Sequence, residues 1–587
     1  MSNSAVSKFS PNLHDRAGRS TPAAKLDFCL PYILTGGALL LLFYQLGAAA
    51  LFEPDEGRNA EKAREILLLR DWVTPHENFH PVLDKPIFFY WLIALCYKLF
   101  GVSEAAARLP SGLAALGCVA VVYWFARAHW GRAVALWSGL ILLTCVEFFL
   151  LARLVIFDMA MTFAITLGLS AFYQASLCED RWRRKGLCFL MYSAFGIATL
   201  IKGLIGVVLP GMVIFGYLLL TNSWPVLRRL YLIPGTLLFL AIVLPWYVEA
   251  GARHEGYLRY FFWEEHFLRF TRDAFNRGEP WYYFFFVAWV GFFPWSLLWP
   301  ALCSRARWTL FDNKALFLIL WAGLPFLFFS GSHSKLPHYI LPIFPALALL
   351  SAARLVALFE ASAERAMKAL SLTWLAHAAV VLYFLVGHWL PAILPRALLA
   401  GVAGISRPLW FYGAALVALS AFFSFARFTR RWGEGQIYLA QMLIMTGFLI
   451  LLTHAMFNAS LQRSAKLVAQ EARPLLTPET QVVVYDSYLA GLGFYLDSEK
   501  PLWVVTHSKK AGTFIGNYYV LGKRTSPGTR WGKALFEFDE FAARWRSAEQ
   551  PLLVLAKAKN KVRLDQQVGA PTKVVASVHD YVWLVRH

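Results

Sequence analysis

Long apolar runs separated by short polar segments make up most of this 587-residue chain. An apolar helix of about 20 residues crosses a bilayer, and most of these runs come close to that length. Because the number of predicted spans is thirteen, an odd number, the two ends of the chain are expected on opposite sides of the membrane. The predicted spans are residues 29–51, 107–127, 132–151, 158–177, 187–201, 204–221, 232–249, 281–303, 315–331, 339–353, 369–390, 409–427 and 436–457.

The pattern changes after residue 457, where polar residues return and short β-type runs replace the long apolar ones. Such runs, with helical or turn-like stretches between them, indicate a small α/β domain of about 130 residues. We therefore divide the chain into an N-terminal tail over residues 1–27, a membrane domain over 28–457 and a C-terminal domain over 458–587. The predicted strands are Gln481–Tyr485, Leu502–Val505, Tyr518–Leu521, Leu552–Leu555 and Val574–Val585.

The composition agrees with a membrane protein. Hydrophobic residues make up 58% of the chain and charged residues 16%, against about 25% charged in a soluble domain. The formal net charge of +20 comes without a basic block interleaved with aromatic residues in a soluble segment, so we do not expect nucleic acid as a partner. The positive charge instead fits the topology signals of membrane proteins and an anionic lipid surface.

The distribution of charge between the spans predicts the orientation. With the N-terminus in the cytoplasm, the short cytoplasmic connections carry 17 Lys and Arg against six acids. The first outer loop, residues 52–106, carries six Lys and Arg against nine acids. Positive residues concentrate on the cytoplasmic side of membrane proteins. The predicted fold is therefore an α-helical polytopic membrane protein whose small α/β domain lies outside, in the periplasm of a bacterial cell.

The first outer loop gathers charged residues between two membrane spans, which makes it the first candidate for a functional site. Asp55, Glu56 and Arg58 lie at its start, and Asp84 and Lys85 follow at its centre. Each group precedes a helical pattern, so both aspartates could also be helix N-caps. In a functional role, Asp55 could act as a general base toward an acceptor hydroxyl or hold a divalent metal.

Further candidates lie in the other outer connections. Asp158 begins an apolar helix, where it could be an N-cap, and Arg153 nearby could be an interfacial anchor; alternatively both face the same outer cavity as Asp55. Lys202 lies in a tight turn between two helices, where it could extend toward the interface or bind a phosphate. Lysine is a good point-charge ligand for phosphate.

Two longer outer motifs add to this set. The turn Ser-His-Ser-Lys-Leu-Pro-His-Tyr places Lys335 and Tyr339 just before a helix, where the lysine could meet a phosphate. The loop over residues 250–280 contains many aromatic residues, as expected at a membrane interface, together with a Glu-His pair. His266 of that pair could bind a metal or contact a diphosphate.

The order of these motifs resembles the GT-C glycosyltransferases of the protein mannosyltransferase superfamily. The series is an outer-loop Asp-Glu, a Lys-Pro element, an outer Arg…Asp pair, a Lys-Gly turn, an FW-x-EH-x-x-RF loop and a SKLPHYILP turn. The resemblance covers nearly the whole chain, and it is greatest to the bacterial branch that transfers 4-amino-4-deoxy-L-arabinose to lipid A.

The resemblance implies an inner-membrane enzyme, expected to be a monomer, that transfers a sugar with inversion from undecaprenyl phosphate to a lipid A phosphate. It implies Asp55 as the key acid and Asp158 as a cavity carboxylate. It also implies a zinc ion near the first-loop acids and a loop histidine, here Asp55, Asp84 and His266. The family commonly has Tyr-Phe-Glu-Lys-Pro where this chain has Val-Leu-Asp-Lys-Pro at residues 82–86. Expected contacts for the donor phosphate or sugar are Arg58, Lys85, Lys202, Tyr339, Lys335 and Glu56.

Other functions remain open at this point. The donor class could be the same with another sugar and a hydroxyl acceptor on a glycan or protein. A transporter would also combine many helices with buried charges, but its charged residues typically lie near the membrane centre, whereas these lie at helix ends on one side. A non-enzymatic membrane scaffold would not need such a one-sided cluster of acids and lysines. A soluble nucleotide-sugar donor is not expected, because no Gly-rich phosphate loop follows a strand.

Overall fold

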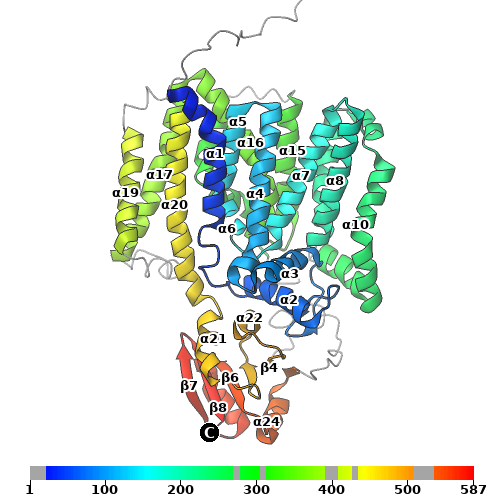
Figure 1. Ribbon diagram of the computed structural model, residues 1–587, viewed down its shortest axis with the longest axis vertical. Helices are drawn as coiled ribbons and strands as arrows, with labels where there is room; N and C mark the ends of the chain where they lie inside the picture. The colour runs from blue at the N-terminus through cyan, green and yellow to red at the C-terminus, as the bar shows by residue number, and fades with distance from the viewer. Residues whose placement is uncertain are drawn as a thin grey trace, which may run out of the picture.

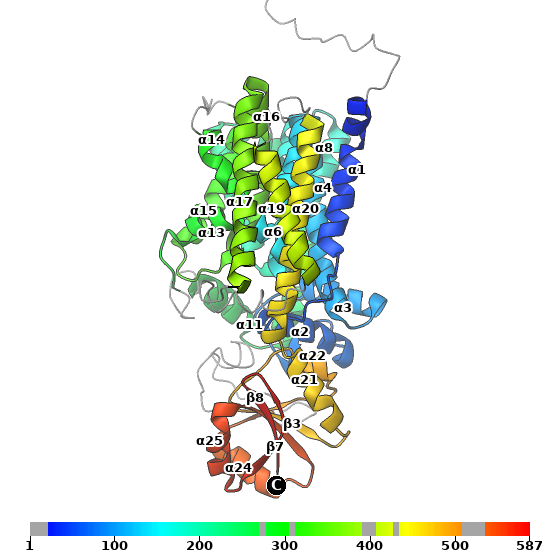
Figure 2. The ribbon, with the colours of Figure 1, turned by 90° about the vertical axis from the view of Figure 1, so that its left-hand side faces the viewer.

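The computed structural model describes residues 22–268, 278–303, 312–389, 407–425, 434–506 and 534–586. A bundle of long, roughly aligned helices forms the larger part, and a small sheet domain lies beyond one end of it (Figure 1). Two short helices of the first outer loop, α2 and α3, lie at that same end, between the bundle and the sheet domain (Figures 1 and 2).

Every predicted apolar segment corresponds to a helix or to a bent helix pair. Two of the predicted spans are broken by sharp bends that the apolar pattern did not predict. α5 (Arg132–Thr144) meets α6 (Val146–Ala152) at 66°, and α13 (Tyr283–Gly291) meets the turn formed by η3 (Trp295–Leu298) and α14 (Trp299–Cys303) at 101°. The continuous helices are α1 (Pro22–Phe43), α4 (Glu104–His129), α7 (Phe157–Leu177), α8 (Arg181–Lys202), α9 (Ile205–Leu220), α10 (Leu232–Arg253), α15 (Asn313–Gly331), α16 (Phe344–Ala361), α17 (Ala363–Trp389), α19 (Arg407–Phe425) and α20 (Glu434–Gln462).

Length and composition support a multi-pass membrane protein. Within the described ranges, eight helices are long and apolar enough to cross a membrane, or up to ten if each bent pair is one span. Shorter apolar helices, among them α9, account for the other predicted segments, so the number thirteen stays a prediction. Large apolar side chains point outward from the bundle, as a lipid-facing surface requires. Examples are Trp124, Phe215, Ile233 and Leu237, all more than half exposed.

The first outer loop is folded rather than extended. α2 (Asp55–Leu69) is followed by a hairpin of two short strands, β1 (His76–Glu77) and β2 (His80–Pro81), and then by α3 (Phe88–Phe100). Pro54 occupies the N-cap position of α2, and Ile87 that of α3, and neither end has a side-chain capping bond. The capping alternative for Asp55 and Asp84 therefore does not hold.

The C-terminal domain contains a six-stranded mixed sheet in the order β5-β4-β3-β6-β8-β7. β3 lies between β4 and β6 and is parallel to both, and β8 pairs antiparallel with β6 and β7. The predicted strand over residues 574–585 is in fact the hairpin of β7 and β8, and β5 was not predicted. The predicted strand Tyr518–Leu521 lies outside the described residues. The strands are β3 (Gln481–Tyr485), β4 (Trp503–Val505), β5 (Leu535–Phe536), β6 (Leu552–Lys557), β7 (Thr572–Val578) and β8 (Tyr581–Arg586).

Side chains of the first outer loop hold the C-terminal domain. Glu53 accepts hydrogen bonds from the backbone amides of Ala490 and Gly491, both 2.8 Å long. The side-chain amide of Asn78 makes two hydrogen bonds to the backbone of Leu502. Its Nδ2 donates to the Leu502 carbonyl at 2.9 Å, and its Oδ1 accepts from the Leu502 amide at 2.7 Å. On α2, the Arg64 guanidinium donates to the carbonyl of Ser498 (2.7 Å) and to the carboxylate of Asp497 (3.2 Å). The sheet domain is thus fixed directly against the loop that carries the candidate site.

The described chain enters the helix bundle at one end and leaves it at the other. α1 begins at the end of the bundle away from the sheet domain, and α20 leads from the bundle toward α21 (Lys466–Ala472) and the sheet (Figures 1 and 2). Which end faces the cytoplasm stays a prediction from the loop charges.

Candidate active site

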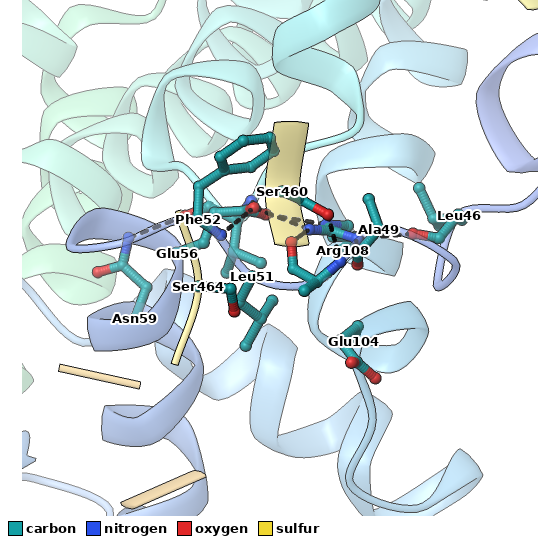
Figure 3. Close-up of polar contacts among 12 residues, drawn as sticks. Leu46, Ala49, Leu51, Phe52, Glu56, Asn59, Glu104, Arg108, Ser460 and Ser464 are labelled. Atoms are coloured by element: carbon teal, nitrogen blue, oxygen red, sulfur yellow. Dashed lines mark hydrogen bonds and ion pairs between the residues drawn. The ribbon is translucent and has the colours of Figure 1, made fainter. Parts of the chain in front are cut away.

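A buried ion pair fixes the start of the outer loop. Arg108 on α4 donates to both carboxylate oxygens of Glu56, at 2.9 and 2.8 Å (Figure 3). Glu56 also accepts hydrogen bonds from the backbone amides of Phe52 (3.0 Å) and Val155 (2.8 Å). The Glu56 side chain is 2% exposed, and both of its carboxylate oxygens accept hydrogen bonds from within the protein. The geometry therefore gives Glu56 a positioning role in place of the expected contact with the donor.

Arginine side chains also bind the chain where it leaves α1. Arg108 donates to the carbonyls of Leu46, Ala49 and Ala50. Arg153 donates to the carbonyls of Leu41, Leu42 and Tyr44 at the end of α1. The last carbonyls of a helix have no partner within the helix, and at a membrane boundary they need one. Arg153 is therefore neither a lipid-facing anchor nor part of the predicted cavity with Asp55.

A network of charges links α2 to the segment before α3. The buried Lys62 ammonium lies 2.7 Å from Asp84 Oδ1 and 3.8 Å from Glu77 Oε2. Arg58, one helical turn earlier, donates from Nε to Glu77 Oε1 at 3.1 Å. Burial alone would raise the pKa of Asp84, but the positive charges of Lys62 and Lys85 hold it well below its usual value. Asp84 is thus an ionised partner of Lys62.

Lys85 retains partial access to solvent. Its side chain is 21% exposed, and Nζ donates to the Asp84 carbonyl at 2.9 Å. A second carboxylate, Glu265 of the loop after α10, lies 3.6 Å from the same Nζ. Glu265 also accepts a hydrogen bond from the Tyr260 hydroxyl at 3.0 Å. The Lys85 ammonium therefore has a long ion pair with Glu265 and remains partly exposed.

Asp55 is exposed at the first position of α2. Its charge acts on Arg58 and on the Tyr90 hydroxyl. That hydroxyl is buried and has no hydrogen-bond partner among the described residues, while its ring lies 5.7 Å from the Lys62 ammonium. Burial, reinforced by the charges of Asp84 and Glu77, raises the pKa of Tyr90 well above its usual value. Asp55 thus shares one electrostatic environment with the Lys62 network.

A second cluster lies at the same end of the bundle. Asp158, in the first turn of α7 and 2% exposed, pairs with Lys202 at the end of α8 and lies 3.7 Å from Nε2 of His338. The N-cap position of α7 belongs to Ile156, so Asp158 does not cap the helix. Lys202 Nζ lies 4.8 Å from the centre of the Tyr339 ring in η4 (Pro337–Ile343). Lys202, Asp158 and Tyr339, predicted from three separate motifs, are brought together.

Aromatic packing joins the two clusters. Phe157, next to Asp158, packs against Phe89 and Tyr90 of α3 with ring centres 4.9 and 5.3 Å apart. The side chain of Asn59 on α2 donates to the carbonyl of Val155, two residues before Phe157, at 2.8 Å.

Lys335 lies apart from both clusters: it is 5% exposed, and Nζ donates to the carbonyls of Glu279 and Ser332. Through these bonds Lys335 connects the segment before α13 to the turn after α15.

The described residues do not assemble the expected metal site. No group of three His, Cys, Asp or Glu among them is placed to hold a metal ion. Oδ1 of Asp84 is occupied by the Lys62 ammonium, and Asp55 lies at the exposed start of α2. The side chain of His266, the third expected ligand, lies outside the described residues. We therefore derive no chemical step through a metal.

Several charged and aromatic residues of this region do not stand out in the sequence. Lys62 lies four residues after Arg58, on the same face of α2, and this spacing could have identified it. Glu77 and Glu265 form ion pairs with the predicted cations Arg58 and Lys85. No sequence motif distinguished these two glutamates from the other acids of the loops. Tyr90 lies among the apolar residues of α3, where an aromatic residue is expected to pack in the core and does not indicate a functional site. Together these residues form a site in which lysine ammonium groups lie close to several carboxylates.

Comparisons with known proteins define the class. Residues 84–248 match the family described as dolichyl-phosphate-mannose-protein mannosyltransferase. The fold matches the crystal structure of ArnT from Cupriavidus metallidurans bound to undecaprenyl phosphate, with a TM-score of 0.79 and 27% identity over 94% of this chain and 97% of that one. The expected resemblance to the GT-C glycosyltransferases of the protein mannosyltransferase superfamily is thus confirmed over residues 84–248, as is the fold class of a helical membrane protein with a small C-terminal sheet domain.

Curated relatives make the resemblance more specific. The chain is 34% identical over 339 residues to the undecaprenyl phosphate-alpha-4-amino-4-deoxy-L-arabinose arabinosyl transferase of Aeromonas salmonicida, covering 56% of this chain and 60% of that protein. A protein of the same name, numbered 1, from Pseudomonas fluorescens is 34% identical over 334 residues, covering 56% and 60%. The matched region thus spans about three-fifths of these relatives, and within its class the chain is similar to the aminoarabinose transferases.

Proposed function

We propose that this chain transfers 4-amino-4-deoxy-L-arabinose from undecaprenyl phosphate to a phosphate group of lipid A, at the periplasmic face of the bacterial inner membrane. The observation that carries this proposal is the cluster of cations and carboxylates around Lys85, Lys202 and Asp158, at the end of the bundle that holds the sheet domain. Its support comes from the similarity of nearly the whole chain to a structure that holds undecaprenyl phosphate.

The reaction exchanges one phosphate for another at the anomeric carbon. An oxygen of the acceptor phosphate attacks C1 of the sugar from the face opposite the donor phosphate, which inverts the configuration. The bond between C1 and the donor oxygen breaks, and its electron pair leaves with undecaprenyl phosphate. Lys85 and Lys202 are the cations placed to stabilise the charge that develops on the departing phosphate, as preorganised positive groups do in other transferases.

The carboxylates have a complementary role. Positive charge develops on the sugar ring in the transition state of glycosyl transfer, and a nearby carboxylate stabilises it. Asp55 and Asp158 are the candidates. An anionic phosphate acceptor needs no strong base, whereas a hydroxyl acceptor would require Asp55 to remove its proton. The identity of the acceptor thus decides whether Asp55 acts as a base.

The zinc ion implied by the family stays a prediction. It would require Asp84 to leave Lys62 and join Asp55 and His266. Elemental analysis of protein purified without chelators tests this directly. Stoichiometric zinc that disappears in the Asp84→Asn variant would support a metal site, and metal-free protein with full activity would exclude a requirement.

The proposal is tested with purified protein in lipid nanodiscs. Undecaprenyl phosphate carrying 4-amino-4-deoxy-L-arabinose is supplied with lipid A, and products are analysed by mass spectrometry. We expect lipid A heavier by one aminopentose and an equal amount of free undecaprenyl phosphate. Transfer to a glycan or protein hydroxyl instead would establish the same donor class with another acceptor. Movement of intact donor across sealed vesicles without any product would identify a transporter.

A further inference from the structure

Two helix breaks meet inside the bundle next to the candidate site. The amide of Val146, at the start of α6, donates to the carbonyl of Phe293, in the bend after α13, at 3.1 Å. Irregular backbone at membrane depth is tolerated where it is buried in protein or lines a cavity. In transporters, such broken helices commonly surround a ligand site. The residue that follows Val146 is the carboxylate Glu147.

Glu147 is buried without a compensating charge. It is 8% exposed, and its Oε1 accepts no hydrogen bond from any described residue. No Lys, Arg or His of the described part of the chain lies within ion-pair distance of it. On its other side, a Cβ added to Gly291 would overlap Oε2, so the carboxylate lies directly against the backbone of α13. This glycine makes the position of the carboxylate possible.

The elements around Glu147 place it beside the candidate site. α6 packs against α7, which carries Asp158, and against η4, which carries Tyr339. Asp158 is balanced by Lys202 and lies 3.7 Å from His338, whereas Glu147 has no such partner. The described residues thus supply a cation to Asp158 but none to the carboxyl group of Glu147. A buried carboxylate is costly unless a cation joins it, so this position suits a positively charged ligand group.

We propose that Glu147 binds the protonated amine of the donor sugar. This inference rests on the proposed function. In a six-membered sugar ring, C1 and C4 lie at opposite ends, so the phosphate on C1 and the ammonium on C4 are attached to opposite ends of the ring. The protein offers a group for each: Lys202 supplies a positive charge beside Asp158, and Glu147 is a buried carboxyl group without a cation. Glu147 would thus determine that an amino sugar is preferred over a neutral one.

The test compares two donors in the same nanodisc assay. One is undecaprenyl phosphate carrying 4-amino-4-deoxy-L-arabinose, and the other carries L-arabinose, which has a neutral hydroxyl at C4. A hydrogen bond to a charged group typically gives a preference of roughly 10- to 100-fold. We expect Glu147→Gln to lower kcat/KM for the amino donor by about that factor. The same variant should leave kcat/KM for the arabinose donor within about threefold of wild type, because no charged contact is lost.

A matched variant separates this effect from loss of structure. Glu65 on α2 is also fully buried with one unpartnered oxygen, Oε1, while Oε2 accepts from the Phe79 amide at 2.9 Å. Glu65→Gln should change kcat/KM for both donors by the same factor. If Glu147→Gln also lowers both equally, Glu147 is structural and the inference is overturned while the proposed function stands. If the wild type transfers neither sugar, the proposed function itself is overturned.

A second substitution covers the case in which Glu147→Gln does not fold. Gly291→Ala places a methyl group where Oε2 now lies and must displace the carboxylate while leaving its charge in the protein. We expect this variant to lose the preference for the amino donor at least tenfold, with the arabinose donor little affected. A retained preference in Gly291→Ala would overturn the assignment.

Discussion

Arg108 and Glu56 form a two-pronged ion pair that joins α4 to α2, with both side chains at most 2% exposed. Arg108 has further partners, the carbonyls of Leu46, Ala49 and Ala50, whereas the other partners of Glu56 are two backbone amides. The pair therefore fixes both the end of the chain segment that follows α1 and the start of the helix that carries Asp55.

Loss of either partner should destabilise the protein. Removal of one member of a buried pair typically costs about 3–5 kcal/mol, because the other charge stays buried. We expect Arg108→Met to lower the thermal unfolding temperature more than Glu56→Gln, since it also leaves three carbonyls without a donor. Thermal unfolding of both variants in the same detergent measures this. Equal or smaller loss in Arg108→Met would mean that the carbonyl bonds contribute little.

Lys85 should be required for transfer but not for folding. Its ammonium is partly exposed and lies 3.6 Å from the buried carboxylate of Glu265, which keeps its hydrogen bond from the Tyr260 hydroxyl when Lys85 is replaced. We expect Lys85→Ala to lower kcat by roughly 10²–10³-fold, as loss of a group that stabilises transition-state charge does. Lys98, in α3 of the same outer loop, is exposed and lies over the Trp72 ring, so Lys98→Ala is the matched control. Similar activity in both variants would reduce Lys85 to a surface charge.

Asp158 and Lys202 should act as a coupled unit. Each neutralising substitution, Asp158→Asn or Lys202→Met, leaves the partner's charge uncompensated, and we expect kcat/KM to fall at least tenfold in each. In contact pairs the effects are not additive, with a coupling of roughly 0.5–3 kcal/mol. The double variant should therefore be no worse than the worse single variant. A fully additive double variant would show that the two residues contact the substrate independently.

The positions of the spans could be predicted from the sequence because hydrophobic length is a local signal. The breaks after Thr144 and Gly291 could not, since the apolar pattern continues through both bends. The two breaks contact each other, because the amide of Val146 donates a hydrogen bond to the carbonyl of Phe293. Such a contact depends on residues that are far apart in the chain.

The same distinction applies to the site. Asp158, Lys202 and Tyr339 stand out as polar residues at helix ends, and the fold brings them together. Glu56 stood out equally, but its partner Arg108 comes from another helix, so its positioning role could not be seen. Glu147 was not predicted at all, because a single acid within an apolar run gives no motif. The sequence thus indicates which residues are unusual, and the fold decides how they are used.

Glu53 should make the attachment of the sheet domain sensitive to pH. Burial raises its pKa from 4.5 to about 7, although hydrogen bonds from the Gly491 and Ala490 amides oppose the shift. The folded protein therefore holds this proton more tightly than the unfolded chain between those values. The stabilisation is complete below pH 4.5 and is lost as pH rises through 7. We expect the thermal unfolding temperature to fall over this interval in wild type and to fall less in Glu53→Gln.

The control for Glu53 is an exposed carboxylate of the sheet domain, Glu479. Glu479→Gln should retain the pH dependence of the wild type. Hydrogen exchange of residues 490 and 491 gives a local measure, because their amides bond to Glu53 directly. The same pH dependence in Glu53→Gln as in wild type would assign the effect to other groups.

Asp55→Asn tests the chemical role of the acid at the start of α2. Pro54 occupies the N-cap position, so Asp55 can support the helix only through the charge that favours an acid in the first turn, about 0.3–1 kcal/mol. A structural role should therefore cost little activity. Asp539 is an exposed acid in the first turn of α24 (Phe538–Ser547), far along the chain in the sheet domain. Asp539→Asn controls for the loss of such a charge at a helix start.

The acceptor distinguishes the two catalytic roles of Asp55. General base catalysis typically contributes roughly 10²–10⁴-fold, so with a hydroxyl acceptor Asp55→Asn should lower kcat by that factor. A lipid A phosphate is already ionised and needs no base. With this acceptor, the decrease in kcat of Asp55→Asn measures only the stabilisation of positive charge on the sugar in the transition state, and it should depend little on pH. The measurement is kcat against pH for wild type and variant with lipid A. Full activity of Asp55→Asn with lipid A would remove Asp55 from the chemistry and leave Asp158 as the carboxylate that supports the reacting sugar.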